Sequence, residues 1–229
     1  KEMNNCYSKF PREKCQASPN SKGHGISDEL INHYQEEHDV RKIWNRSLSI
    51  PQAVFGDANP DLANYPNPDK LSDKEWDTFL KKVKKDPHQH RIPNDRLRII
   101  AEHLANHWKR DSFCDFEDLY DYIQSLLAKP SSNPARLIKN PNALIIYDIA
   151  LRLAHRFNTW PEKYVYLNGN GPYDAAIALG LRNDIKHRRI LYSEMIQSEM
   201  IQYYPQLAKL DAAQIEDFLC IYHNQLQIH

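Results

Sequence analysis

The sequence predicts an all-α fold, with a single multi-helix globular domain behind an irregular N-terminal arm. Its 229 residues include only six glycines, too few for a fold built on tight hairpins or glycine-rich nucleotide loops. Apolar residues recur at helical spacing in most segments, and several of these segments follow a capping residue. One short run, KYVYL over 163–167, has the composition of a β-strand.

The N-terminal arm is expected to span 1–70. Its first part, 1–25, is irregular because of its prolines and glycines. Ser27 can cap a helix over 28–44, where apolar residues follow a helical period. Residues 49–70 are rich in Pro, Asn and Asp. We expect them to form the longest irregular connection and the boundary with the main domain.

The main helical domain is expected to span 71–229. Ser72 and Glu75 have the spacing of a capping box, which marks a helix start. Pro141 suits the first turn of a nearly apolar helix over 142–157, which we expect at the centre of the core. Further helices are expected at 73–85, 93–110, 116–129, 188–204 and 211–226.

The composition argues against a membrane-spanning protein and against a strong overall charge. No apolar run approaches the roughly 18–20 residues that a transmembrane helix needs. Thirty Lys and Arg balance thirty Asp and Glu, so attraction to nucleic acid or anionic lipid would require a local basic patch. We expect a soluble protein, either cytoplasmic or secreted. The chain starts at Lys1 without an initiator Met, which suggests a processed or excised piece.

The four cysteines form no metal or redox motif. None of them makes a C-x-x-C pair, which argues against a zinc ribbon or a thioredoxin-like site. Cys6 and Cys15 can close a small disulfide loop in an oxidising compartment, and the alternative is four free thiols. Because the sequence also has no Walker loop and no Rossmann fingerprint, we expect no cofactor.

The glycines gather in one segment, 166–181, which holds three of the six. Residues 161–167 can form a short helix and 172–180 a second one, with the sequence NGNG as the turn between them. Gly169 and Gly171 would allow either a positive φ or a close backbone approach at this turn.

The string L-N-G-N-G-P-Y-D-A resembles the hairpin of the helix-hairpin-helix family of nucleic-acid-binding motifs, whose pattern is L-P-G-h-G-x-x-x-A with h apolar. The resemblance extends over 163–179. The residues that match are Leu167, Gly169, Gly171 and Ala175, whereas Asn168 replaces the proline and Asn170 the apolar residue. The resemblance implies that backbone amides at the start of the second helix contact a DNA phosphate. The unpaired donors and the dipole of a helix N-terminus suit that role.

Basic residues around the hairpin would supply a local basic patch. The expected nucleic-acid-binding residues are Lys163, Gly169, Asn170, Gly171, Arg182, Lys186, Arg188 and Arg189. Contact with phosphates predicts binding that is independent of nucleotide sequence and weakens with salt. The glycosylases with this hairpin carry a catalytic Asp further along, which no acid here matches, so the resemblance implies binding without base excision. The alternative is a helical corner capped by glycine and followed by a solvated basic face.

A second hypothesis is a metal-dependent hydrolase or nuclease. His33 and Glu37 lie one turn apart on the first predicted helix, and His24 precedes that helix. Imidazole and carboxylate groups at this spacing can hold a divalent metal or transfer protons. His103 and His107 form a second i, i+4 pair that could chelate a metal. The alternative for both sets is a pair of helix faces turned to solvent, with no common site.

A third hypothesis is a helical domain that binds another protein, such as an adaptor or part of a secreted effector. Thirteen tyrosines would suit an amphipathic contact surface. An exposed aromatic patch away from the basic run would favour this hypothesis, whereas tyrosines in the core would account for the composition equally well.

Overall fold

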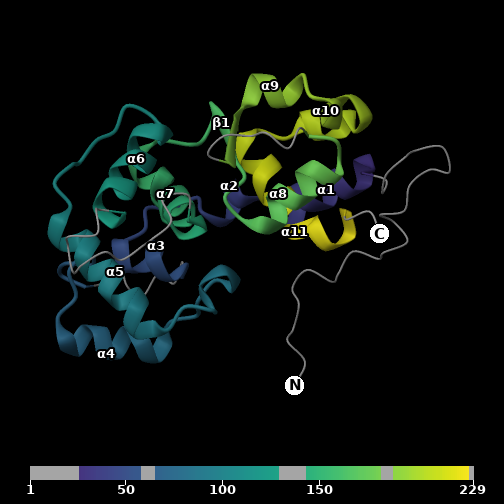
Figure 1. The fold of residues 1–229 in the computed structure, drawn as a ribbon. Coiled ribbons are helices and arrows are strands. Elements are labelled where there is room, and N and C mark those ends of the chain that lie inside the picture. The colour runs from purple at the N-terminus through teal and green to yellow at the C-terminus, as the bar shows by residue number, and fades with distance from the viewer. Residues whose placement is uncertain (1–25, 58–64, 129–142, 182–187, 227–229) are drawn as a thin grey trace. The chain divides into compact units, whose positions relative to one another are not determined.

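The fold was analysed in a computed structural model, which describes residues 26–57, 65–128, 143–181 and 188–226. The expected all-α class is confirmed, because helices make up most of the described chain (Figure 1). Within these residues, no helix is both long enough and apolar enough to cross a membrane.

The chain forms two compact units. Unit 1 combines 1–43 with 161–229, and unit 2 is the continuous stretch 44–160. The chain therefore passes between the units after Ile43 and after Trp160, whereas the sequence suggested one boundary near residue 70.

Unit 2 is built around the helix that the sequence placed at the centre of the core. This helix, α7 (Leu144–Phe157), packs against α3 (Ile50–Phe55) and α6 (Phe116–Leu127). The unit also contains α4 (Asp73–Lys82), the 3₁₀ turn η3 (Pro87–Gln89) and α5 (Asn94–His107). The helices expected over 73–85, 93–110, 116–129 and 142–157 are thus confirmed, each a few residues shorter than expected. Pro141 lies outside the described residues.

The start of α4 confirms the predicted capping box. The backbone N–H of Ser72 donates to Glu75 Oε2 at 2.7 Å, and the Ser72 hydroxyl donates to the same oxygen at 2.6 Å. These hydrogen bonds satisfy groups that a helix start would otherwise leave without a partner. They also lower the pKa of Glu75, because the bonds from the Ser72 side chain and backbone favour the carboxylate.

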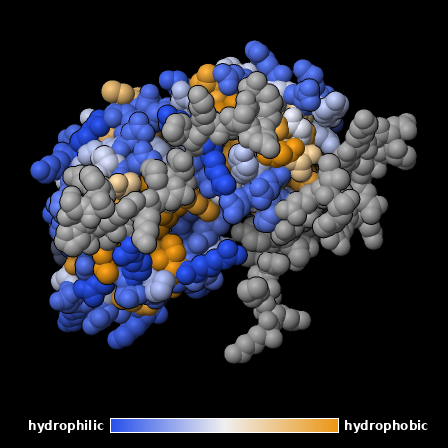
Figure 2. All heavy atoms as spheres, viewed as in Figure 1, coloured by the Kyte–Doolittle hydropathy of each residue, from blue (hydrophilic) through white to orange (hydrophobic). Residues whose placement is uncertain are grey.

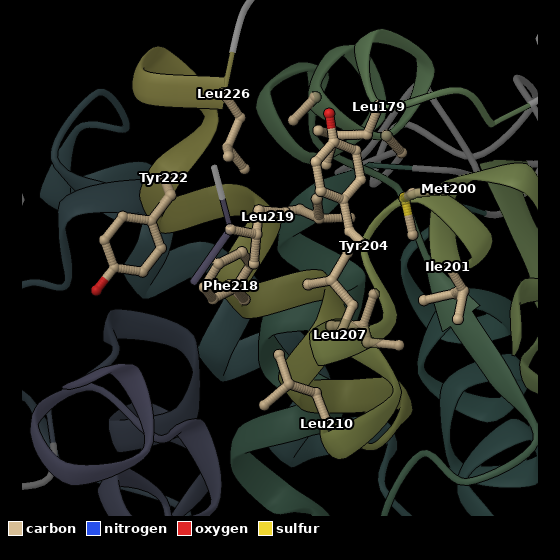
Figure 3. Packing of buried hydrophobic residues seen from close by; sticks show 14 of the residues in the cluster. Leu179, Met200, Ile201, Tyr204, Leu207, Leu210, Phe218, Leu219, Tyr222 and Leu226 are labelled. Carbon is tan, nitrogen blue, oxygen red and sulfur yellow. The ribbon is translucent and has the colours of Figure 1, made fainter. Parts of the chain in front are cut away.

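Unit 1 surrounds a second apolar core. Its elements are α1 (Asp28–Glu37), α2 (Val40–Ile43), β1 (Tyr164–Tyr166), α8 (Asn170–Ala178), β2 (Arg189–Leu191), α9 (Tyr192–Ile196), α10 (Glu199–Tyr203), the 3₁₀ turn η5 (Pro205–Lys209) and α11 (Ala212–Leu226). The longest, α11, packs against α8 and β1. Figure 3 shows side chains from α10 and α11, together with Leu179 and Leu207, gathered in one cluster.

Two of the expected helices in unit 1 are broken into shorter elements. The helix expected over 28–44 stops at Glu37, because Asp39 caps a new helix, its Oδ1 accepting from the N–H of Arg41 at 3.0 Å. The helix expected over 188–204 is replaced by β2, α9 and α10, with a break at Ser198. In both places a polar residue lies in the middle of the apolar pattern, Asp39 in the first and Ser198 in the second. Each of these residues lies at the start of a new helix.

The segment before the glycine turn is also different from the expected helix. Residues 164–166 form β1, which pairs antiparallel with β2 in the register Tyr164↔Leu191, Val165↔Ile190 and Tyr166↔Arg189. The β-like composition of KYVYL therefore describes this segment better than a helix does. Its partner strand is remote in sequence, which is why local spacing alone did not decide between the two structures.

Candidate nucleic-acid interface

The two-stranded sheet brings Arg188, one of the predicted basic residues, to the start of α8. Beyond the paired strands, the N–H of Leu167 donates to Arg188 O at 2.7 Å and the N–H of Tyr192 donates to Lys163 O at 2.9 Å. These bonds extend the ladder at both ends. As a result, Arg188 and Arg189 lie at the end of the ladder that leads into the turn before α8, whereas Lys163 lies at the other end.

The start of α8 lacks a side-chain cap in the described structure. Gly169 is the N-cap residue, and its backbone is extended, with φ −77° and ψ 154°. The N–H of Tyr173 donates back to Gly169 O at 3.3 Å, so the amides of Asn170 and Gly171 come before the first intrahelical bond. Asn170 is exposed to solvent.

The two glycines of the turn have different roles. Neither has a positive φ; the glycines that do, within the described residues, are Gly56 and Gly180. Gly171 instead allows a close approach, because a Cβ there would lie 3.1 Å from both Cγ and Nδ1 of His223 on α11. Of the two alternatives that the sequence left open, close packing explains Gly171.

Arg188 is anchored over the helix start. Its Nη1 donates to the side-chain oxygen of Asn170 at 2.8 Å and to the backbone oxygen of Asn168 at 3.5 Å. Its guanidinium carbon lies 4.7 Å from the ring centroid of Tyr173. The backbone of Arg188 is left-handed, with φ 52°, a conformation that few residues other than glycine adopt.

The other two cations lie over a second tyrosine. The guanidinium carbon of Arg189 is 4.9 Å from the ring centroid of Tyr164, and Lys163 Nζ is 5.3 Å from the same centroid. Contacts of this kind orient a cation and leave its charge in place.

These three cations have no carboxylate partner within the part of the chain that the structure describes. Some other cations of the described chain are paired with acids, as Arg41 is with Asp211 at 2.6 Å and Arg110 with Asp118 at 2.6 Å. The ion pairs of the described residues include none of Lys163, Arg188 or Arg189. We call these three residues, with the start of α8, the α8 surface. Arg182 and Lys186, the remaining predicted basic residues, lie outside the described residues.

Two of the three histidine and glutamate candidates of unit 1, His33 and Glu37, lie in the described residues. His24 lies outside the described residues. His33 packs edge-to-face on His38, with the ring centroids 5.5 Å apart, and Glu37 is exposed. In the described chain, no group of three or more His, Cys, Asp or Glu residues is arranged to hold a metal ion.

His103 and His107 are neighbours on α5, and each is bonded to a backbone carbonyl. Their rings lie 4.2 Å apart. His103 Nε2 is 3.1 Å from Leu126 O, and His107 Nδ1 is 2.9 Å from His103 O. A ring nitrogen must carry its proton to donate to a carbonyl, so neither of these two nitrogens could also ligate a metal. The pair therefore stabilises α5 and its contact with the end of α6.

The tyrosines do not form a broad exposed surface. Of those in the described residues, only Tyr203 is largely exposed, at 66% of its full area, and the others are buried or half-buried. Most of them contribute to the cores, which accounts for the high tyrosine content.

A buried charge cluster in unit 2 was not predicted from the sequence. On α7, Asp148 accepts from Gln89 Nε2 at 2.9 Å, and Arg152 donates to Gln89 Oε1 at 2.8 Å and to Ala53 O at 3.0 Å. The ring of His88 lies 3.3 Å from Asp148 Oδ2. The signal in the sequence was the i, i+4 spacing of Asp148 and Arg152 inside an otherwise apolar helix.

The same cluster controls the ionisation of Asp148. Burial by itself would raise the pKa of Asp148, but the charges of His88 and Arg152 and the hydrogen bonds from His88 and Gln89 favour the carboxylate. The net effect holds the pKa of Asp148 below its ordinary value. Because every member of the cluster bonds another, the arrangement fastens η3 to α7 and α3.

Comparison with known proteins returned no match: no protein-family model, no curated protein and no solved structure is similar to this chain.

Proposed function

We propose that the protein contacts nucleic acid through phosphate groups at the α8 surface. The observation that supports this proposal is the set of three cations, Lys163, Arg188 and Arg189, held over tyrosine rings without a carboxylate partner in the described structure. A phosphodiester backbone would supply the missing negative charge.

The geometry of Arg188 suits a phosphate. In the described structure it uses only Nη1 for hydrogen bonds, to Asn170 and Asn168, so the remaining N–H groups of the guanidinium are available as donors. A guanidinium binds phosphate oxygens with two parallel hydrogen bonds. The amides of Asn170 and Gly171, at the positive end of the helix dipole, would add donors at the same place.

Binding of this kind would not depend on nucleotide sequence. Phosphate contacts fix position and orientation, and base edges must be contacted for sequence to be recognised. The affinity would fall with salt, with a slope of log K against log salt of about −0.9 for each phosphate neutralised on duplex DNA.

A salt series with matched variants tests the proposal. Binding of a fluorescent DNA duplex is measured by anisotropy for the wild type, Lys163→Gln, Arg188→Gln and Arg189→Gln. The control is Lys209→Gln, which removes an exposed unit 1 lysine that is paired with Asp28 at 2.9 Å. Each of the first three variants is expected to flatten the slope by about 0.9, with the control unchanged. Binding that is insensitive to salt, or equally weakened by the control, would contradict the proposal.

A further inference from the structure

A second concentration of positive charge lies in unit 2, at the end of α4 and in the loop that follows it. Lys81 and Lys82 occupy the last turn of the helix, and Lys84 and Arg91 lie in the loop that leads to α5. All four side chains are exposed to solvent. We call these four residues the α4 surface. Figure 2 shows the hydrophilic residues that cover α4, at the lower left.

Hydrogen bonds fold the loop back so that its two ends lie together. Lys85 Nζ donates to Ile92 O at 2.8 Å, and a ring nitrogen of His90 lies 2.8 Å from Lys85 O. These two contacts hold 90–92 next to residue 85. Arg91 is therefore close to Lys85 and its neighbour Lys84, although it follows them by several residues in the sequence.

Two acids near this surface, Asp86 and Asp57, are held by contacts within unit 2. Asp86, the only acid between Lys81 and Arg91, lies 3.3 Å from Nη2 of the buried Arg152 through its Oδ1. The carboxylate of Asp57 accepts the backbone N–H of Lys84 at 2.9 Å and is itself buried. Among the described residues, no ion pair involves Lys81, Lys82, Lys84 or Arg91.

Helix stabilisation explains only part of this arrangement. Lysines in the last turn stabilise a helix because their positive charge lies near the negative end of the helix dipole. This effect accounts for Lys81 and Lys82. Lys84 and Arg91 lie beyond the helix, so the dipole does not account for them. In the sequence, Asp86 offsets some of the local charge, but in the structure its negative charge faces Arg152.

We propose that the α4 surface is a second contact for the phosphate backbone of nucleic acid, on the other unit of the chain. The surface itself is derived from unit 2 alone, but the choice of partner rests on the function proposed above. The lack of apolar side chains favours nucleic acid over a membrane. Amphipathic helices that lie in a membrane interface have a broad apolar face beside their cations, whereas the one large exposed hydrophobic residue of unit 2 in the described chain is Ile99, on α5.

Two phosphate-binding surfaces on one chain have a measurable consequence. Each surface neutralises its own set of phosphates, so each contributes separately to the salt dependence of binding. When both bind the same nucleic acid, the second contact is intramolecular, and the affinity exceeds that of either surface alone.

The test uses the full-length chain and a fluorescent DNA duplex in a salt series. The variant combines Lys81→Gln, Lys82→Gln, Lys84→Gln and Arg91→Gln. The control combines Lys70→Gln and Lys74→Gln, two exposed lysines at the acidic start of the same helix. We expect the slope of log K against log salt to flatten by about 2–4 in the variant, at roughly 0.9 per lost contact, and to stay unchanged in the control. Far-UV circular dichroism checks that both proteins remain folded.

The outcomes separate this inference from the function proposed for the α8 surface. If the fourfold variant keeps the wild-type slope while Arg188→Gln flattens it, the α4 surface is not a contact and the α8 proposal stands. If the fourfold variant flattens the slope while Arg188→Gln has no effect, the α4 surface is a contact and the α8 proposal fails. Absence of DNA binding by the wild type overturns both. Tighter binding to phosphatidylserine vesicles than to DNA, lost in the fourfold variant, would overturn the choice of nucleic acid as the partner.

Discussion

Gly56 is the residue at which backbone conformation and packing limit unit 2 most tightly. It ends α3 in the left-handed region, with φ 69°. A Cβ there would overlap the Cβ of Asp86 and would lie 2.9 Å from Cζ of Arg152. A side chain at residue 56 would therefore push directly on the buried charge cluster.

Gly56→Ala is expected to lower the free energy of unfolding by about 2–5 kcal/mol. The left-handed conformation contributes about 1–2 kcal/mol for a residue with a Cβ, and overpacking against two well-held side chains adds about 1–3 kcal/mol. Urea denaturation followed by circular dichroism measures the change. An unaltered midpoint would show that Asp86 and Arg152 move aside easily, against the packing described here.

Asp148 makes the stability of unit 2 dependent on pH. Its folded pKa lies below the unfolded value, so its contribution is fully present above pH ~4 and is lost as the pH falls through the folded pKa. Asp148→Asn removes one partner from a buried charge cluster, which costs about 3–5 kcal/mol at neutral pH. The difference from the wild type should shrink steadily below pH ~4.

The measurement is urea denaturation of the wild type and Asp148→Asn from neutral to acidic pH. Asp77→Asn, a change to an exposed carboxylate on α4, is the control and should follow the wild type throughout. A difference between wild type and Asp148→Asn that stays constant at all pH values would mean that the mutation acts through packing and not through charge.

At the scale of single elements, α4 allows a test of the capping box. Ser72→Ala removes the hydroxyl that donates to Glu75 at the start of this helix. The same change should raise the pKa of Glu75 toward its ordinary value, because the Ser72 side-chain hydrogen bond is the largest cause of its lowering. NMR titration of the Glu75 carboxyl measures this shift. A pKa that does not move would contradict the hydrogen bond.

The elements that sequence reasoning predicted best are those whose signals are local. Ser72 and Glu75 mark the start of α4, and an apolar period identifies α7. Asp39 was harder to interpret, because a polar residue inside an apolar pattern can either face solvent or start a new helix. The strand β1 depends on pairing with 189–191, and this distant contact outweighs local preference.

The candidate site residues were likewise predictable where the signal is local and not where it depends on distant contacts. Lys163, Arg188 and Arg189 were predicted from composition, but the bond from Arg188 to Asn170 depends on the β1–β2 pairing. The lysines at the end of α4 are equally visible in the sequence. The sequence analysis did not single them out, and the structure adds that the carboxylate of Asp86 faces Arg152.

For the whole molecule, the division into two units is the feature that sequence reasoning did not find. A continuous unit 2 interrupts unit 1, so 26–43 and 161–226 must come together to complete one core. Leu30, Ile31 and Tyr34 on α1 are fully buried in that core. Apolar periodicity reports which face of a helix is buried but not which helices share a core.

This connectivity predicts different behaviour for two fragments of the chain. Residues 44–160 contain a complete core, with Phe55, Trp76 and Phe79 in mutual ring contact, and should fold alone into a helical, cooperatively unfolding domain. Residues 161–229 lack α1 and should not unfold cooperatively. Circular dichroism during urea titration of each fragment tests both expectations.

Gly56→Ala provides the control for the first fragment. If unit 2 is an independent unit, the substitution should lower the free energy of unfolding of 44–160 by the same amount as in the full chain, within about 0.5 kcal/mol, because separate units add independently. A fragment 44–160 that is unfolded on its own, or a fragment 161–229 that unfolds cooperatively, would show that the core of each unit is not divided as the contacts indicate.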